Sequence, residues 1–317
     1  MLTSEQLEFF NHNGYLVVDQ VLDQKAALDP VRAEYDRLLE QLYANWYQQG
    51  QVKAAPDGMT FDQKLIESYR SGCDWFRPFD ISLPGDKILA DTPMHFGPAI
   101  FDMVTNSRLL DIVESLIGPE ISSNPIQHIR IKPPAPDLQK GEVRAHITST
   151  DWHQDRAVAL AEADQTNMIT VWCAVTDATE ENGCLQVIPR VHQDGMKPHC
   201  PRTQTAIADN QIDVDQAVSL PVKSGGIVIF HPLTPHASLI NRSTGIRWSF
   251  DLRFNVTGEP TGRAHFPEFV ARSANKPELE LKDWWEWRNL WYEARARLAD
   301  SPHIDIHRWS ADAPACA

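Results

Sequence analysis

Cysteine is scarce in this chain: its 317 residues include only five, Cys73, Cys173, Cys184, Cys200 and Cys316. Their number is odd, their spacing is wide and no Cys-x-x-Cys pair occurs, which argues against both a disulfide framework and a zinc–thiolate site. We therefore expect reduced thiols. The chain also lacks an apolar run of about 18 residues and an opening basic segment followed by an apolar one. These absences predict a cytoplasmic protein without a membrane span.

Positive charge is also in short supply, because 29 Lys and Arg stand against 43 Asp and Glu, for a net charge of −14. Nucleic acids and anionic membrane surfaces would be repelled, so neither is expected as a partner. The hydrophobic content of 42% at this length is enough to bury the core of a globular enzyme.

Three side chains have the chemistry and spacing of metal ligands. His153 and Asp155 lie two positions apart in TSTDWHQDRAVAL, so in an extended segment both leave the same face. His236 follows a run, residues 225–230, that reads as a buried strand entered by a glycine turn. Two histidines and one carboxylate form the facial triad of non-haem Fe(II) oxygenases, which leaves the opposite face of the metal open. We predict that these residues bind Fe(II), against the alternative that they are hydrogen-bonding core residues.

Arg247 lies eleven residues after His236, at the start of the predicted strand IRWSFDLRFN. Two neighbouring strands can place His236 and Arg247 at opposite ends of one bound diacid. A guanidinium holds a carboxylate through two parallel hydrogen bonds. The spacing therefore predicts a 2-oxo acid co-substrate whose far carboxylate binds Arg247.

In their order along the chain, these segments resemble the phytanoyl-CoA dioxygenase-like family of Fe(II)/2-oxoglutarate-dependent oxygenases. The matching pieces span roughly residues 2 to 255 and are LTSEQLEFFNHNGYLVVDQVL, QHIRIKPP, WHQD, VWCAVTDATEENGCLQVIP and GGIVIFHPLTPHASLINRSTGIRWSF. The resemblance implies Fe(II), 2-oxoglutarate as co-substrate and O2, with release of succinate and CO2. It implies hydroxylation of a C–H bond in a small, natural-product-like molecule. The net negative charge disfavours a coenzyme A thioester, whose phosphates need a basic surface.

One loop departs from the family pattern. The family usually has Pro-Gly-Ser-His where this chain has Pro189-Arg190-Val191-His192. Because that loop usually borders the substrate, the difference indicates an unusual substrate or a reshaped turn. It does not affect the metal-binding positions.

The resemblance also implies further co-substrate residues. Ser238 corresponds to a position whose hydroxyl supports the carboxylate, and Trp172 to a tryptophan that contacts 2-oxoglutarate, although an inward tryptophan is often only core. Simple alignment places another contact at His128. In the strand QHIRIK, however, Gln127 shares its face with two isoleucines, which suggests that Gln127 faces inward. One of the two faces the pocket, unless a bulge admits both.

Helical patterns precede strand patterns along the chain, which predicts a β-barrel or sandwich with helices packed outside. The resemblance implies a double-stranded β-helix, or jelly-roll, core. We expect a mainly β fold with flanking helices in a single oxygenase domain. Its parts are a helical region over about 1–120, a jelly-roll core over about 121–256 and a C-terminal helical extension over about 257–317.

Two segments outside the core invite functional interpretations. The predicted helix 283–298 carries a stripe of tryptophans, which we interpret as docking on the barrel or on a second subunit of a homodimer. Residues 50–95 are long for a connection and contain the aromatic cluster Trp75–Phe79. We predict that this segment is a lid that lines the substrate side of the pocket.

Other enzyme classes share parts of this pattern. A halogenase would need a small residue in place of Asp155. A cupin-type metal enzyme that uses no 2-oxoglutarate would not need Arg247 at this spacing, and a non-catalytic binding module would lack a metal ligand. Desaturation, epoxidation and ring rearrangement use the same site as hydroxylation and stay open as alternatives.

Overall fold

The computed structural model describes residues 1–317 except 86, 136–146, 203, 302–305, 307 and 317. Its centre is a six-stranded antiparallel sheet of order β1-β9-β4-β11-β2-β12. The strands are β1 (Tyr15–Val18), β9 (Ile227–Phe230), β4 (Met168–Ala174), β11 (Arg247–Val256), β2 (Glu120–Lys132) and β12 (Phe269–Ser273).

A second, four-stranded sheet of order β3-β10-β5-β8 packs against the first. Its strands are β3 (Thr150–His153), β10 (His236–Ser238), β5 (Leu185–Val187) and β8 (Val218–Leu220), and a separate hairpin joins β6 (His199–Pro201) to β7 (Thr205–Ile207). Two facing antiparallel sheets with helices outside confirm the predicted mainly β, jelly-roll core.

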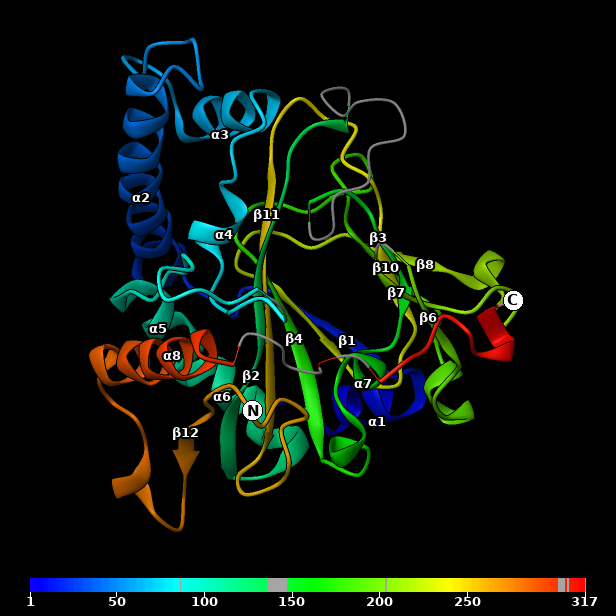
Figure 1. The fold of residues 1–317 in the computed structure, drawn as a ribbon. Helices are drawn as coiled ribbons and strands as arrows, with labels where there is room; N and C mark the ends of the chain where they lie inside the picture. The colour runs from blue at the N-terminus through cyan, green and yellow to red at the C-terminus, as the bar shows by residue number, and fades with distance from the viewer. Residues whose placement is uncertain (86, 136–146, 203, 302–305, 307, 317) are drawn as a thin grey trace.

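Helices cover the outer face of the larger sheet, while the smaller sheet lies on its other side (Figure 1). The longer helices are α1 (Ser4–Asn13), α2 (Asp29–Gln48), α3 (Phe61–Arg70), α5 (Pro98–Val104), α6 (Ser107–Ile117) and α8 (Trp284–Ala299). Single turns form α4 (Phe76–Phe79), α7 (Asp155–Val158) and the short helical segments Gln24–Leu28, Ala161–Ala163, Val191–Asp194, Val214–Gln216, Pro277–Leu279 and Pro314–Cys316.

The strands β4 and β9 of the larger sheet are buried on both faces, and alternation decides which core each of their side chains joins. In β4, Val171 and Cys173 pack under the helices, whereas Trp172 and Ala174 pack between the two sheets. In β2, Ile129 likewise faces the helices. Near the end of β2, the side chains of Gln127, Ile129 and Ile131 therefore point away from the space between the sheets.

Residues 98–117 form two helices, α5 and α6. The break falls at Asn106, whose side-chain carbonyl accepts hydrogen bonds from the backbone N–H groups of Arg108 and Leu109 at 3.1 and 3.3 Å. An asparagine in this position satisfies donors at a new helix start, so it begins α6 and does not continue α5.

The tryptophan stripe of α8 packs against the rest of the fold, as predicted by the first of the two interpretations, docking within the same chain. Trp287 and Trp291 are buried, and their rings lie 4.6 and 5.1 Å from the ring of Phe96. A homodimer stays a prediction.

The expectation of reduced thiols is wrong for two cysteines. Cys200 in β6 and Cys316 form a disulfide across a sequence separation of 116 residues, while Cys73, Cys173 and Cys184 are free and buried. Spacing along the chain could not reveal this pair because the fold alone brings the two segments together. Among the described helices, none is long and apolar enough to cross a membrane.

Candidate active site

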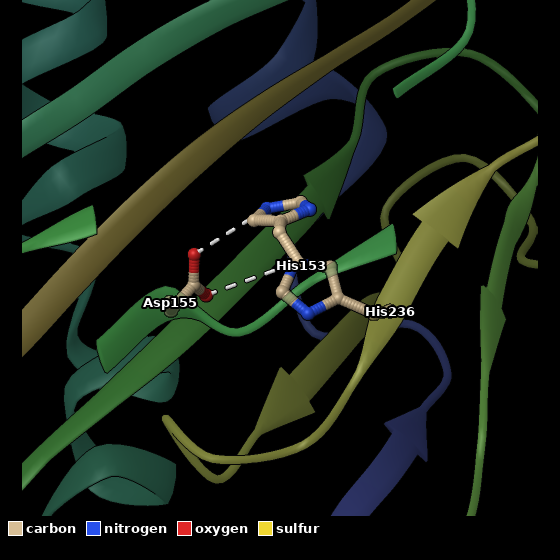
Figure 2. A group of neighbouring side chains, drawn as sticks. All are labelled: His153, Asp155 and His236. Carbon is tan, nitrogen blue, oxygen red and sulfur yellow. Dashed lines mark ion pairs between the residues drawn. The ribbon is translucent and has the colours of Figure 1, made fainter. Parts of the chain in front are cut away.

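His153, Asp155 and His236 converge between the two sheets. β3 and β10 are antiparallel neighbours, with His153 directly opposite His236 in the register, and Asp155 begins α7 just beyond β3. Figure 2 shows both imidazoles and the carboxylate pointing toward one another. Asp155 Oδ1 lies 3.8 Å from His153 Nε2, and Asp155 Oδ2 lies 3.8 Å from His236 Nε2. One donor atom from each residue lies within 4.8 Å of the others, which suits one metal ion.

Backbone carbonyls fix the orientation of both imidazoles. His153 Nδ1 lies 2.8 Å from the carbonyl oxygen of Asp151, and His236 Nδ1 lies 3.0 Å from that of Thr234. Because a carbonyl oxygen only accepts, each Nδ1 carries the hydrogen and each Nε2 presents its lone pair to the centre. The ring of Phe230 stacks on His236 at 4.6 Å and holds it further.

Asp155 is almost fully buried, with 1% of its surface exposed. Burial raises the pKa of its carboxyl group, but the Arg253 guanidinium and the two imidazoles lower it more, to well below its usual range. Burial, aided by His236, lowers the pKa of His153 to about 3. An anionic carboxylate and a neutral imidazole are the protonation states that bind metals.

The donor set also fits a metal because one of its atoms has no other partner. Arg253 pairs with Asp155 Oδ1, whereas Oδ2 is buried and has no hydrogen-bond partner among the described residues. Buried carboxylate oxygens are rarely left unpaired in folded proteins. Two imidazoles and a carboxylate, arranged to leave one face open, suit Fe(II).

Arg247, at the start of β11, places a buried cation beside this cluster. Its side chain is 1% exposed, Nη1 donates to Ser249 Oγ at 2.6 Å, and the guanidinium carbon lies 5.4 Å from the ring centroid of Trp172. Burial lowers its pKa to about 10, so it stays charged at neutral pH. Arg247 makes no ion pair with any carboxylate in the described part of the chain. It is therefore available to an anionic ligand.

The sequence interpretation missed Lys132, which also lies in this cavity. Its ammonium donates to Ser238 Oγ and to the carbonyl oxygen of Leu239, each at 2.6 Å. Burial, together with the charges of Arg247 and Arg130, lowers the pKa of Lys132 well below its usual value. The alternation of QHIRIK contained the signal, because it places Lys132 on the same face of β2 as His128.

The structure brings most of the predicted residues into one narrow cavity between the sheets, lined among others by His153, Asp155, Trp172, His236, Ser238 and Arg247. A second cavity of about 420 Å³ adjoins it, and His153, Arg130, Thr150 and Arg253 line both. The two cavities therefore meet at the His153 side of the triad.

Gln127 and His128 face opposite sides of β2, and the inward placement of Gln127 is wrong. The amide of Gln127 donates to the carbonyl oxygen of Ile81 at 2.8 Å on the helix-facing side, and Gln127 lines neither of the two cavities. The apolar partners of Gln127 face a helix-covered core and not the pocket. His128 lines the larger cavity, and its Nδ1 lies 3.0 Å from Asp80 Oδ2.

The aromatic cluster of the expected lid is part of the core. Trp75, Phe76 and Phe79 are buried, and the backbone around them forms α4, so the cluster packs and does not cover the pocket. Among the described residues of this segment, only Arg77 and residues 82–85 reach the larger cavity. The lid prediction is therefore wrong for the aromatic residues.

The loop that departs from the family pattern keeps a conformation typical of glycine. Arg190 has a φ of 69°, in the left-handed region, and its N–H donates to the carbonyl oxygen of Asn13 at 3.0 Å. His192 is buried, and its ring lies against Gly14, where an added Cβ would come within 2.4 Å of Nδ1. The loop packs on the end of α1 and lines neither cavity.

The model of the family described as phytanoyl-CoA dioxygenase (PhyH) matches residues 10–249. The chain belongs to the phytanoyl-CoA dioxygenase family. Membership confirms the resemblance seen in the sequence and the expected enzyme class, a 2-oxoglutarate-dependent non-haem iron oxygenase.

Curated relatives of this family member cover most of its length. The peroxisomal phytanoyl-CoA dioxygenase of Bos taurus is 24% identical over 306 residues, with 91% of this chain and 82% of the relative covered. Phytanoyl-CoA dioxygenase 1 of Oryza sativa subsp. japonica is 28% identical over 270 residues, with coverage of 79% and 88%.

Solved structures share the fold. The non-haem monooxygenase ThoJ in its apo form is 21% identical with a TM-score of 0.56, covering 93% of this chain and 97% of its own. EvdO2 from Micromonospora carbonacea var. aurantiaca, complexed with 2-oxoglutarate, is 19% identical with a TM-score of 0.54, covering 82% and 94%. At these identities the likeness concerns the fold alone.

Proposed function

We propose that this family member hydroxylates a C–H bond of a small molecule, using Fe(II) and O2 and converting 2-oxoglutarate to succinate and CO2. His153, Asp155 and His236 hold the metal, which supplies the redox chemistry when bound. Arg247, Ser238 and Trp172 hold the co-substrate in the narrow cavity, and the larger cavity receives the substrate.

The observation that carries this proposal is an open donor set beside a buried cation that forms no ion pair with any described carboxylate. Asp155 Oδ2 has no partner in the described structure, and the imidazoles are oriented toward the same point. Arg247 lies in the same cavity and is charged. Burying a charge without a partner is costly, so the arrangement favours an anionic ligand beside the metal. A cupin-type enzyme without 2-oxoglutarate would gain nothing from Arg247.

The chain's own residues position the reactants. The guanidinium of Arg247 holds the far carboxylate in a fork geometry, and the face of Trp172 limits the movement of the co-substrate. Trp172, Leu185 and Phe230 form the apolar part of the inner wall, and most of the other residues that line this cavity are polar or charged. The larger cavity, at about 420 Å³, lies in the range of small-molecule pockets and reaches the metal site at His153.

Related structures support these assignments without deciding the reaction. EvdO2 was solved with 2-oxoglutarate, and the epimerase SnoN with Fe3+, α-ketoglutarate and nogalamycin RO, at a TM-score of 0.52 and 18% identity. One of these proteins is an epimerase, so the shared fold does not decide the reaction. We propose hydroxylation, and desaturation, epoxidation or rearrangement would be recognised from the product.

The test is an anaerobic titration of the protein with Fe(II) and 2-oxoglutarate, followed by succinate analysis after O2 is admitted. We expect one Fe(II) per chain, and loss of both metal binding and succinate formation in His153→Ala, Asp155→Ala and His236→Ala. His265→Ala, at an exposed histidine, is the matched control and should behave as wild type. Full activity in any one of the three triad variants would refute the metal assignment.

A further inference from the structure

Several arginines line the wall of the larger cavity. Its lining includes Arg77, Arg130, Arg202, Arg253 and Arg263, and no Asp or Glu is among the described residues that line it. This wall contrasts with the net charge of −14 of the whole chain. A cleft lined by charges of one sign attracts a ligand of the opposite sign.

The carboxylates that pair with two of these arginines lie outside this wall. Asp251 accepts from Arg130 Nε at 2.6 Å, and Asp155 pairs with Arg253, but both acids line only the inner cavity. The two guanidinium groups therefore line the larger cavity, while these two carboxylates face the inner cavity.

Asp80 does not line the larger cavity but fixes two residues that do, Arg77 and His128. Its carboxylate is 0% exposed and accepts from His128 Nδ1 at 3.0 Å, from Arg77 Nη2 at 3.3 Å and from the N–H of Ile129 at 3.2 Å. The Arg77 guanidinium also lies 4.6 Å from the ring centroid of Phe76. The Arg77 side chain is 22% exposed and lines the larger cavity. Arg77 is thus held in place at the cavity wall.

The remainder of the cavity is largely apolar. Its wall includes Leu83, Ile126, Phe266, Ile306 and Trp309. A ligand that matches both the arginine-lined part and the apolar part of the wall has a hydrocarbon skeleton and one anionic end.

We propose that the substrate is a small, largely apolar molecule with one anionic group, and that Arg77, held by Asp80, binds that group. Carboxylate, phosphate and sulfonate groups share the required chemistry. This inference rests on the proposed function, because it takes the larger cavity as the substrate site. With the anion at Arg77, the apolar part of the molecule extends toward His153, where the cavity meets the metal site.

Calorimetry with matched ligands tests this inference. The protein is kept anaerobic with Fe(II) and saturating 2-oxoglutarate, so that the inner cavity is filled, and titrated with 4-phenylbutanoate and with its neutral amide. Phenylalkyl phosphate and sulfonate extend the series and identify the preferred anion. At least one acid should bind about tenfold or more tightly than its neutral analogue, and added salt should reduce the difference.

Arg77→Gln should abolish this preference for the acid while the affinity for 2-oxoglutarate stays unchanged, and Arg77→Lys should restore part of it. Arg108→Gln, at an exposed arginine on α6, is the matched control. Equal binding of acid and amide, no binding of any acid, or a preference that survives in folded Arg77→Gln would overturn the inference. Succinate formed without substrate tests the proposed function separately, so failure of one is distinguishable from failure of the other.

A second, independent observation concerns the hydroxyl of Ser238. Its oxygen accepts from the N–H of Thr150 at 3.0 Å and from Lys132 Nζ at 2.6 Å. A hydroxyl oxygen has two lone pairs and one hydrogen, so both lone pairs are occupied and the hydrogen must be donated elsewhere. Ser238 lines the inner cavity together with Arg247.

We infer that Lys132 is a positioning residue for the co-substrate: it holds Ser238 as a donor to the carboxylate that Arg247 binds. Lys132→Met should raise the KM for 2-oxoglutarate about tenfold, with kcat at saturating 2-oxoglutarate largely retained. Ser238→Ala should have a similar effect.

The double variant distinguishes positioning from independent contributions. If Lys132 acts through Ser238, Lys132→Met combined with Ser238→Ala should lose little more affinity than the worse single variant. The inference would be overturned if the losses of 2-oxoglutarate affinity in the two single variants multiply in the double variant. It would also be overturned if kcat and the melting temperature fall while the KM is unchanged. Lys282→Met, at an exposed lysine, is the control.

Discussion

Removal of the Arg247 guanidinium is the most direct perturbation of the proposed co-substrate site. The side chain is 1% exposed, so water has little access to it, and no carboxylate among the described residues forms an ion pair with it. Truncating one member of a buried charge pair costs about 2–5 kcal/mol. At about 1.4 kcal/mol per factor of ten, the expected loss of 2-oxoglutarate affinity is roughly thirtyfold to several thousandfold.

Arg247→Met keeps most of the side-chain volume and removes the charge, so it isolates this effect from cavity formation. Its KM for 2-oxoglutarate should rise roughly thirtyfold to several thousandfold, while its KM for the substrate should change little. Arg247→Lys should recover only part of the affinity, because an ammonium cannot make the paired hydrogen bonds of a guanidinium. The assay is initial-rate succinate formation over a range of 2-oxoglutarate concentrations.

An unchanged KM in a folded Arg247→Met variant would mean that the co-substrate is a different acid or binds elsewhere. A matched control is Arg242→Met, close in sequence but without a place in either cavity.

Three further predictions concern stability. Burial lowers the pKa of His199 and of His231 to about 4 each, so the unfolded chain binds more protons between about pH 6.5 and pH 4, and the free energy of unfolding of the metal-free protein should fall as pH is lowered through this window. In denaturant titrations, the free energy of unfolding of His231→Gln should depend less steeply on pH than that of the wild type. An unchanged slope against pH would contradict the assignment to His231. Cys316→Ser should lower stability by about 2–4 kcal/mol by opening a long loop, and reducing agent should then have no further effect on the melting temperature. Arg190→Gly should raise stability by up to about 1 kcal/mol because it relieves a left-handed φ of 69°, and a loss would show that the side chain contributes contacts of its own.

The metal triad could be predicted from the sequence because its geometry is largely local. His153 and Asp155 are two residues apart at the end of one strand, and His236 begins the neighbouring strand after a turn. The position of Arg247 follows from the start of β11. Wherever residue spacing fixes direction, the sequence interpretation and the structure agree.

Residues that meet only through the fold could not be placed in this way. Asp80 contacts His128 across 48 positions, and Cys200 pairs with Cys316 across 116. No period or motif marks either pair. The same holds for the wall of the larger cavity, because Arg77 and Trp309 lie far apart in the sequence and both line it.

Gln127 shows why alternation alone can mislead in a sheet with two buried faces. In β2 the helix-facing side chains and the cavity-facing side chains are both shielded, so apolar neighbours mark a core without saying which core. The charges on the other face, His128, Arg130 and Lys132, were the better guide. Buried cations need a counter-ion or an anionic ligand. A run of them on one face of a buried strand therefore indicates that this face binds an anion.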